Sequence, residues 1–363
     1  MIHILHVVGA RPNFIKATPV LLALSAKKGV RQTLVHTGQH YDVNMSDIFF
    51  RQLGMPVPDV SLGVGSGTHA QQTAQVLVGL EPILLTNKPD IVIVYGDVNS
   101  TMAAALAASK LGIPVAHVEA GLRSGDREMP EEINRIITDH ICDVLFTPSK
   151  DGDNNLAHEG ISRKKVRFIG NVMIDTLIRL LPAAKRPSEP TLQGPYVLVT
   201  LHRPANTDEP VTLLKLMRAL ISISKTAPVV FPIHPRTRKR LADAGFKAPP
   251  GGRLLLIEPL GYLEFLALQR DAALVVTDSG GIQEETTYLG VPCLTVRTTT
   301  ERPITITAGT NKLVRNLADL PREAGAALKR ARKPARAIRL LDGKAGERAA
   351  TGVLAWLAQR RAA

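Results

Sequence analysis

The sequence predicts an α/β protein with two doubly wound parallel-sheet domains facing a cleft. Three observations predict this fold class. Short apolar runs alternate with segments of helical period, a proline-rich stretch interrupts the alternation near the middle of the chain, and the same alternation then starts again. A chain of 363 residues, of which 45% are hydrophobic, is long enough to bury two cores.

The first half contains apolar runs that are typical of strands, at residues 2–9, 32–38, 90–97, 113–121, 143–148 and 166–170. Segments of helical period lie among them, for example at residues 12–26 and 101–111. Strands that alternate with helices in this way form a parallel sheet with helices on both faces. We therefore expect an N-terminal domain over residues 1–171.

A linker is expected near residues 171–194, because the segment LLPAAKRPSEPTLQGP is rich in proline. Further apolar runs follow it, at residues 196–202, 228–234, 253–259, 272–278 and 292–296. They predict a second domain of the same architecture over residues 172–344.

The formal net charge of +13 is concentrated near the C-terminus, where residues 321–363 hold eleven lysines and arginines against three acidic residues. Solvated helix faces explain such a tail, and a patch for nucleic acid or an anionic membrane is the alternative. Aromatic residues make up only 4% of the chain and do not interleave with the basic residues, which disfavours binding by base stacking. We expect neither a nucleic-acid partner nor a membrane partner.

The two cysteines, Cys142 and Cys293, lie far apart and form no CxxC pair, so neither a disulfide framework nor a zinc knuckle is indicated. No apolar run approaches the roughly 20 residues that span a bilayer, and the N-terminus lacks the basic leader of a signal peptide. A cytoplasmic protein is expected.

Polar residues gather in the loops that follow the apolar runs, where parallel sheets bind their ligands. In the stretch TDSGGIQEE, a strand runs into Ser279, Gly280 and Gly281 and then into a helix. Backbone amides at the start of a helix bind anions, so a diphosphate fits here. Glu285, about one turn later, is placed to accept hydrogen bonds from ribose hydroxyls.

Three cations also follow strands. Arg11 and Lys16 come after the first strand, and Arg302 follows the last. Arginine at a strand end is a bidentate ligand for phosphate. Each would be ordinary surface charge alone, but their shared position at strand ends favours an anion site.

Acid–base groups accompany the anion site. Asp97 and Glu119 end two strands of the first domain, Glu131 begins a helix after Pro130, and His202 ends the first strand of the second domain. Helix capping and salt bridges are the structural alternatives for the acids. Together these groups suit proton transfer beside a phosphate leaving group.

Neither a cofactor nor a metal ion is expected. The first strand-to-helix turn lacks the GxGxxG fingerprint, and GVGSG at residues 63–67 does not follow a strand, which argues against a nicotinamide cofactor. The ten histidines are scattered, without an HExxH motif or a close pair.

The chain resembles the non-hydrolysing UDP-N-acetylglucosamine 2-epimerases in a series of ordered motifs, namely GARPNFIKA, HTGQHYDVNM, GDVNST, HVEAGLRSGD, MPEEINR, LHRPAN, DSGGIQEE and TERP. The resemblance runs from residue 2 to about residue 309, and DGKAGERAATGVLAWL resembles the closing helix of that family. It implies two Rossmann-like domains of the glycosyltransferase-B type and a homodimer. It also implies a final helix, at about residues 345–363, that packs back on the first domain.

The resemblance implies reversible C2 epimerisation of UDP-N-acetylglucosamine to UDP-N-acetylmannosamine, through a 2-acetamidoglucal, for surface polysaccharide precursors. UDP leaves C1 while a base removes the C2 proton, and UDP adds back after reprotonation on the other face. Catalysis is then expected from Asp97, Glu119, Glu131 and His202, with the identity of the C2 base left open. Contacts to the UDP-sugar are expected from Arg11, Lys16, Arg123, Arg135, His234, Tyr262, Ser279, Gly280, Gly281, Glu285 and Arg302.

The chain departs from the common family pattern at Asn13, at Pro204 and Ala205, and at Ile304, so that two expected acids are lost. A branch of the family acts on UDP-2,3-diacetamido uronic acids, and the loss of negative charge would ease binding of a uronate. That substrate is the alternative to UDP-N-acetylglucosamine. A B-type glycosyltransferase, which needs an acceptor groove, and a basic nucleic-acid binder are the remaining alternatives.

Overall fold

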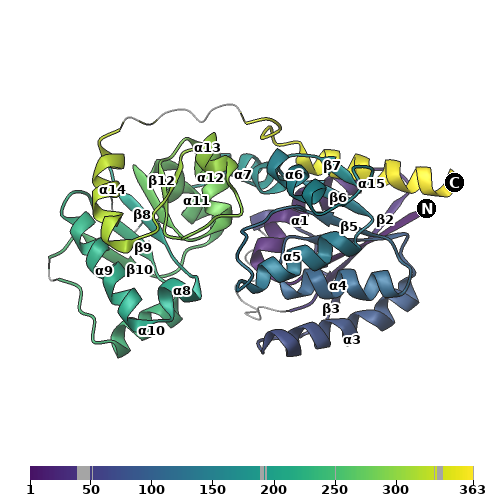
Figure 1. Ribbon diagram of the computed structural model, residues 1–363, viewed down its shortest axis with the longest axis horizontal. Helices are drawn as coiled ribbons and strands as arrows, with labels where there is room; N and C mark the ends of the chain where they lie inside the picture. The colour runs from purple at the N-terminus through teal and green to yellow at the C-terminus, as the bar shows by residue number, and fades with distance from the viewer. Residues whose placement is uncertain are drawn as a thin grey trace. The chain divides into compact units, whose positions relative to one another are not determined.

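The computed structural model describes residues 1–38, 50, 52–188, 192, 194–249, 251–330, 332 and 338–362. The chain divides into two compact units (Figure 1). Unit 1 consists of Met1–Arg179 and Arg339–Ala363, and unit 2 consists of Leu180–Ile338. Each unit has its own parallel sheet, which confirms the predicted class of two parallel-sheet α/β domains.

The sheet of unit 1 has seven strands in the order β3-β2-β1-β4-β5-β6-β7, and all neighbouring strands are parallel. The order reverses between β1 and β4, which is where such sheets bind ligands. The strands are β1 (Ile2–Val8), β2 (Val30–His36), β3 (Val60–Ser61), β4 (Ile91–Tyr95), β5 (Val115–Val118), β6 (Val144–Thr147) and β7 (Val166–Phe168). The helices are α1 (Arg11–Ser25), α3 (His69–Asn87), α4 (Asn99–Lys110), α5 (Pro130–Ile141), α6 (Lys150–His158), α7 (Val172–Leu180) and α15 (Ala345–Ala362).

The sheet of unit 2 has six parallel strands in the order β10-β9-β8-β11-β12-β13, and its order reverses between β8 and β11. The strands are β8 (Val197–Thr200), β9 (Val229–Pro232), β10 (Leu254–Ile257), β11 (Leu274–Thr277), β12 (Cys293–Thr295) and β13 (Asn311–Leu313). The α-helices are α8 (Pro204–Thr207), α9 (Pro210–Ser224), α10 (Pro235–Asp243), α11 (Tyr262–Asp271), α12 (Gly280–Leu289), α13 (Ile304–Thr307) and α14 (Leu320–Leu328). Two short 3-10 helices cover Leu181–Ala183 and Leu317–Asp319.

Apolar side chains cover both faces of the central strands. All of β4, with the sequence IVIVY, is buried, as expected for a strand between two helical layers. In β8, Val197 and Val199 belong to one core cluster, whereas Leu198 belongs to another together with Leu268 of α11. Successive strand residues point to opposite faces, so β8 packs against helices on both sides.

The predicted linker is partly helical. Residues 172–180 form α7. Its sequence, VMIDTLIRL, has a helical period, but the prolines that follow it led to the prediction of a linker. The Thr176 hydroxyl donates a 2.7 Å hydrogen bond to the carbonyl oxygen of Ile15, which ties α7 to α1. Unit 1 runs to Arg179 and so includes nearly all of α7, whereas the N-terminal domain was expected to end at residue 171.

The last helix, α15, packs against α1 at the other end of the chain. Figure 1 shows it in yellow beside the strands of unit 1. The backbone amide of Gly346 donates a 2.7 Å hydrogen bond to Asp175 Oδ2. A Cβ atom at Gly346 would lie 2.7 Å from Pro19, so glycine permits the close approach of the two helices.

We predict that Gly346→Ala lowers the free energy of unfolding of unit 1 by about 1–3 kcal/mol, because the added methyl group overpacks the contact with Pro19. Gly79 of α3 is the matched control, since its added Cβ would approach Leu62 no closer than 3.5 Å. Gly79→Ala is expected to be neutral or to stabilise α3 by up to about 1 kcal/mol. Urea unfolding followed by the fluorescence of Trp356, the single tryptophan, measures both variants. Equal midpoints for the two variants would contradict the prediction.

Candidate active site

Lys16 and Glu119 form a buried ion pair at the carboxyl edge of the unit 1 sheet. Lys16 Nζ of α1 lies 3.0 Å from both carboxylate oxygens of Glu119, which directly follows β5. Their side chains are 4% and 2% exposed. Both were predicted as site residues, and the structure brings them together.

Glu119 adopts a backbone conformation that is unusual for a residue with a side chain. Its φ is 77°, in the left-handed region, which costs roughly 1–2 kcal/mol. The amides of Glu119 and Ala120 both donate to the carbonyl oxygen of Phe146, at 3.1 and 3.0 Å. A Cβ atom on the following Gly121 would lie 2.5 Å from the carbonyl oxygen of Gly152, so the chain has little room to relax. Such strain is characteristic of functional sites.

Asp97, which follows β4, is held by an arginine of α5. Arg135 Nη2 donates a 2.5 Å hydrogen bond to Asp97 Oδ2, and Nη1 donates to Glu132 Oε2 at 2.7 Å. Glu132 also accepts hydrogen bonds from the backbone amides of Ser124 and Gly125. Burial by itself would raise the pKa of Glu132, but these amides and Arg135 lower it below its ordinary value. Arg135, predicted to contact substrate, therefore bridges two carboxylates.

Asn13 connects the β1–α1 loop to the end of β4. Its Oδ1 accepts from the amides of Gly9 and Ala10, at 3.0 and 3.1 Å, and its Nδ2 donates to the carbonyl oxygen of Tyr95 at 2.7 Å. A glutamate has no amide hydrogen to donate to Tyr95. The Asn13 side chain binds backbone groups through both its oxygen and its nitrogen. The residue that differs from the common family pattern therefore holds the β1–α1 loop against the end of β4.

In unit 2, a buried carboxylate organises the loop that carries His202. Asp278, fully buried after β11, accepts hydrogen bonds from the amides of His202 and Arg203 and from Asn206 Nδ2. His202 Nδ1 lies 3.3 Å from Asp278 Oδ1, while the imidazole is 59% exposed. His202 is thus held at its backbone and accessible at its ring.

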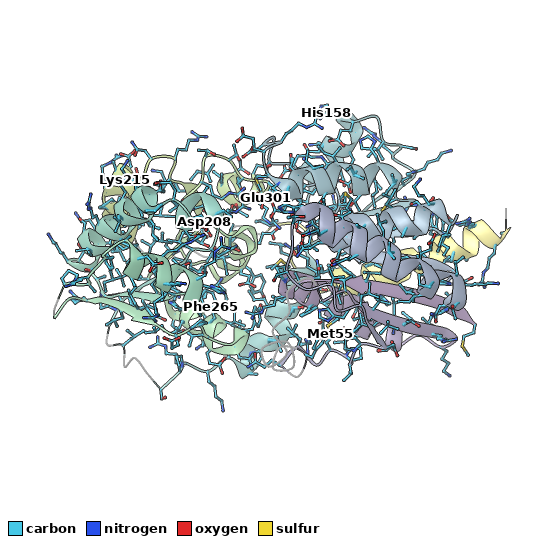
Figure 2. The ribbon with its side chains drawn as sticks, turned by 90° about the horizontal axis from the view of Figure 1, so that it is seen from below. Met55, His158, Asp208, Lys215, Phe265 and Glu301 are labelled. Atoms are coloured by element: carbon cyan, nitrogen blue, oxygen red, sulfur yellow. The ribbon has the colours of Figure 1, made fainter. Side chains whose placement is uncertain are left out.

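Buried charged side chains pack against the turn of unit 2 that contains Ser279 and Gly280. Ser279 precedes α12, which begins at Gly280. A Cβ atom on Gly280 would lie 2.4 Å from Arg302 Nη1, so a larger residue here would displace the Arg302 guanidinium. Arg302 Nη1 donates to Glu301 Oε1 at 2.5 Å, and its Nε lies 2.8 Å from Glu284 Oε2. Glu301 is buried, whereas Lys215 is exposed at the surface of unit 2; both are labelled in Figure 2.

Glu285 and Tyr262, both predicted as substrate contacts, are hydrogen-bonded to each other. The Tyr262 hydroxyl donates to Glu285 Oε1 at 2.9 Å. The Glu285 side chain is buried, and burial raises its pKa to about 7. One turn into α12, Gln283 accepts from Thr300 and Asn311, which fixes the TERP loop against this helix.

Four further predicted residues lie in a loop or at the start of a helix. Arg123 donates to both oxygens of Glu159 and to Asp139 Oδ2, in a network with 10% exposure of its side chain. Glu131 is half-buried in the first turn of α5, next to Glu132, whose carboxylate binds the loop amides of Ser124 and Gly125. Arg11 begins α1, and His234 is an exposed N-cap whose Nδ1 accepts from the amide of Arg236.

Several residues beside the candidate site were missed in the sequence, although all of them except Asp139 lie inside the recognised motifs. They are His117, Glu132, Asn134, Asp139, Asp278, Gln283, Glu284 and Glu301. The spacing of Glu132, Arg135 and Asp139 gives a signal, because residues three and seven positions apart share one helix face. All three are buried, so α5 turns a charged face inward.

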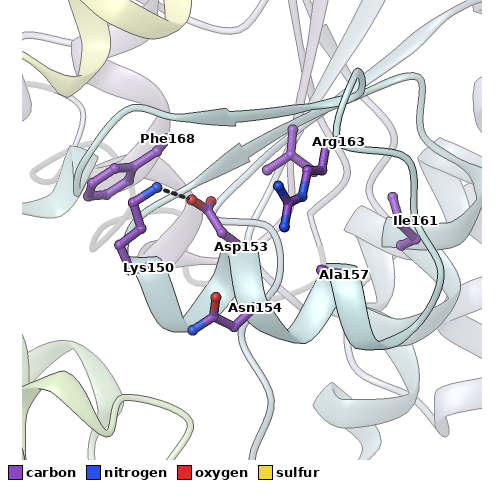
Figure 3. A pocket seen from close by; sticks show the side chains of 8 residues that line it. Lys150, Asp153, Asn154, Ala157, Ile161, Arg163 and Phe168 are labelled. Carbon is purple, nitrogen blue, oxygen red and sulfur yellow. Dashed lines mark hydrogen bonds and ion pairs between the residues drawn. The ribbon is translucent and has the colours of Figure 1, made fainter.

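A separate cavity of about 380 Å³ lies beside α6 and the edge strand β7 (Figure 3). Lys150 Nζ donates to Asp153 Oδ2 at 2.7 Å and lies 5.0 Å from the centre of the Phe168 ring. The residues that line this cavity lie outside the predicted site.

Among the described residues, no group of three or more histidines, cysteines, aspartates or glutamates is arranged to hold a metal ion. Within the same part of the chain, every helix is too short or too polar to cross a membrane.

The family described as UDP-N-acetylglucosamine 2-epimerase matches residues 22–353. The chain belongs to this family. This confirms the resemblance that the motifs indicated, and with it the enzyme class, an isomerase.

Two relatives and one solved structure illustrate the similarity. A UDP-N-acetylglucosamine 2-epimerase of Methanococcus maripaludis is 47% identical, over 85% of this chain and 86% of its own length. The UDP-2,3-diacetamido-2,3-dideoxy-D-glucuronate 2-epimerase of Pseudomonas aeruginosa is 48% identical, over 86% of this chain and 88% of its own. The crystal structure of a Methanocaldococcus jannaschii UDP-GlcNAc 2-epimerase, in complex with UDP-GlcNAc and UDP, matches with a TM-score of 0.90 at 41% identity, over 98% of this chain and 100% of that one.

We predict a pH-dependent stability difference between the wild type and Glu285→Gln. The pKa of Glu285 rises from 4.5 to about 7 on folding, so its stabilising contribution is complete below pH 4.5 and is lost as pH rises through about 7. The glutamine side chain does not ionise, so the variant does not lose this stability as pH rises. The free energy of unfolding of the variant, relative to wild type, should therefore increase by on the order of 2 kcal/mol between about pH 5.5 and about pH 8.

Urea denaturation of the ligand-free protein, followed by circular dichroism at both pH values, measures this difference. The control is Glu258→Gln, whose carboxylate is 78% exposed and remains in water. A relative stability of Glu285→Gln that does not change with pH would contradict the prediction.

Proposed function

We propose that this chain epimerises UDP-N-acetylglucosamine at C2, reversibly, to UDP-N-acetylmannosamine, without a cofactor. The observation that carries the proposal is the pair of carboxylates at the ends of adjacent parallel strands. Asp97 follows β4 and Glu119 follows β5, and each is held by a cation from a different helix. The family, and a relative of that name at 47% identity, support the substrate.

The unit 2 cluster is proposed to bind the UDP moiety. Ser279 and Gly280 present the amino end of α12, whose backbone amides and partial positive charge suit a diphosphate. His202 is accessible beside the buried Asp278 and supplies a donor for the leaving oxygen. Tyr262 and Glu285 are proposed to bind the ribose hydroxyls. The neutral carboxyl form of Glu285 donates a hydrogen bond, whereas its ionised form only accepts them.

The unit 1 carboxylates are proposed to transfer the proton. The C2 hydrogen of a 2-acetamido sugar is not next to a carbonyl group, so its removal needs help from C1. As the C1–O bond breaks, its electron pair leaves with UDP, one carboxylate takes the C2 proton, and the C1=C2 bond of 2-acetamidoglucal forms. On return, a carboxyl group delivers a proton to the opposite face of C2, and the UDP oxygen bonds to C1 again. Asp97 and Glu119 are the groups proposed for these two roles.

A UDP-2,3-diacetamido uronic acid is the second candidate substrate. A relative that bears the name of such an epimerase is 48% identical, which favours it as much as the other relative favours UDP-N-acetylglucosamine. Asn13 does not add to this case, because its side chain is occupied by backbone hydrogen bonds. Pro204 and Ala205 remain relevant, since both are exposed at the start of α8.

We expect the purified protein to exchange the C2 hydrogen of UDP-N-acetylglucosamine with solvent deuterium while forming the mannosamine epimer. Proton NMR in heavy water, with the diacetamido uronate measured in parallel, identifies the preferred substrate. A glycosyltransferase would not exchange this hydrogen. Absence of exchange with both sugars would remove the proposal.

Asp97→Asn and Glu119→Gln are expected to reduce turnover by about 10²–10⁴, the usual contribution of general acid–base catalysis. Both variants should retain UDP affinity, measured by calorimetry, because the diphosphate and ribose contacts are assigned to other residues. Glu128→Gln is the control, since Glu128 is exposed in the loop before α5. Wild-type turnover in either site variant would exclude that residue from catalysis.

We further propose that two copies associate through a face of unit 1 made by α3, α4 and α5. A groove of about 540 Å³ on this face is lined mainly by apolar side chains, including Leu77, Met102, Ile133 and Ile137. The isoleucines of α5 point here because its charged face is buried inside the unit. An amphipathic helix with its apolar face outward requires a cover.

A second copy of the chain is the favoured cover. Along its 19 residues, α3 carries only one Asp, Glu, Lys or Arg, Glu81, and it exposes Val78 and Leu85 by 75% and 54%. Two copies with a net charge of +13 repel each other least where charged side chains are few. The apolar face that includes α3 therefore favours close approach more than the charged surface does.

The double variant Val78→Glu with Leu85→Glu is expected to convert the dimer to a monomer, because it places like charges opposite each other on the face. Sedimentation velocity measures the oligomeric state. Val57→Glu is the control, since Val57 is 83% exposed and lies outside α3, α4 and α5. A wild type that is monomeric, or a double variant that is dimeric, would contradict this interface.

The cytoplasm remains the proposed compartment. Cys142 and Cys293 are free thiols, and burial raises the pKa of both, which keeps them in the unreactive form. We also propose that the product, UDP-N-acetylmannosamine, is used to make surface polysaccharide precursors.

A further inference from the structure

A fully buried histidine–aspartate pair lies beneath the two candidate catalytic carboxylates. His117 of β5 and Asp139 of α5 are both 0% exposed, and His117 Nδ1 lies 2.7 Å from Asp139 Oδ1. Neither was among the residues predicted for catalysis or binding. The chemistry proposed above assigns no step to either of them.

Asp139 bonds the chain on both sides of Glu119. One carboxylate oxygen accepts from His117, two residues before Glu119, and the other accepts from the amide of Gly121, two residues after it, at 3.0 Å. The residue between them has the left-handed φ of 77°. A single carboxylate therefore spans the strained turn and opposes its relaxation.

The other nitrogen of the same imidazole fixes the turn that precedes Asp97. His117 Nε2 lies 2.8 Å from the carbonyl oxygen of Gly96, and the Gly96 amide donates to the carbonyl oxygen of Val118 at 2.9 Å. Gly96 has a φ of 63° and directly precedes Asp97. The peptide group from which Asp97 extends is thus held by His117.

Both partners of the imidazole are hydrogen-bond acceptors, so both ring nitrogens must donate. A carbonyl oxygen accepts only, and the Asp139 carboxylate already accepts from Arg123 and from the amide of Gly121. The ring therefore carries a proton on each nitrogen, and Asp139 is its counter-ion. Arg123 Nη1 donates to the other oxygen of Asp139 at 2.7 Å, and Glu159 in turn binds Arg123.

We propose that His117 and Asp139 are positioning residues that set Asp97 and Glu119 together. The inference rests on the proposed function, in which these two carboxylates transfer the proton. Through its two nitrogens the imidazolium joins the ends of β4 and β5, so the spacing of the carboxylates follows from one buried pair. Neither His117 nor Asp139 touches the sugar.

Two substitutions separate the two hydrogen bonds of the ring. Asparagine places its amide near Nδ1, so His117→Asn retains the bond to Asp139 and loses the bond to Gly96. Glutamine places its amide near Nε2, so His117→Gln retains the bond to Gly96 and loses the bond to Asp139. Asp139→Asn removes the charge that balances the ring while its size is kept.

We expect each of the three variants to lower kcat by roughly 10- to 100-fold, the effect of small misplacements of reacting groups, with KM changed much less. UDP affinity should remain that of the wild type. His117→Gln combined with Asp139→Asn should be no slower than the slower single variant, because the two residues act as one unit.

His3→Gln is the matched control. His3 is also a buried histidine of this sheet with both ring nitrogens in hydrogen bonds, to Thr33 Oγ1 and to the carbonyl oxygen of Asn87. It lies at the amino end of β1, away from the site. Its variant should lose thermal stability, as the His117 variants do, and keep the wild-type kcat.

A readout independent of activity keeps this proposal separate from the proposed function. NMR of the wild type labelled with 15N-histidine should show a proton on both ring nitrogens of His117, and one unprotonated nitrogen would overturn the bridge. Folded His117 variants with wild-type kcat, or a loss in His3→Gln equal to theirs, would overturn the positioning role. Failure of deuterium exchange in the wild type would instead remove the proposed function and leave the NMR result to decide the bridge.

Discussion

Pairing of two strand-end carboxylates with buried cations from neighbouring helices is the interaction on which the unit 1 site depends. Lys16 reaches Glu119 from α1, and Arg135 reaches the partly buried Asp97 from α5. A buried charge without its partner costs several kcal/mol, so these pairs constrain how both helices sit on the sheet. The inward charged face of α5 and its outward isoleucines follow from the same requirement.

Unit 2 applies a related arrangement at the edge of its own sheet. A buried acid after a central strand, Asp278, gathers backbone amides of the neighbouring loop, as Asp139 does in unit 1. The one cation under the glycine turn in these pairs, Arg302, is matched by Glu284 and Glu301. In both units a fully buried carboxylate holds backbone amides beside the residues proposed for the site.

The sequence predicted the strands and the groups at their ends, because apolar runs and the residues after them are local signals. It therefore supplied both members of the Lys16–Glu119 pair. It missed β3 and β13, which have two and three residues and carry little periodicity. Asp139 was missed for a different reason, since its partners are His117 and Gly121, far from it in sequence and set only by tertiary packing.

The two ends of the chain belong to the same unit, and unit 2 is inserted between them. All of unit 2 is therefore synthesised before α15, which packs on α1. Domains generally fold as they emerge during synthesis. Unit 1 departs from that order, because α1 packs on β1 and β2 at once but completes its packing only after residues 345–362 have been synthesised.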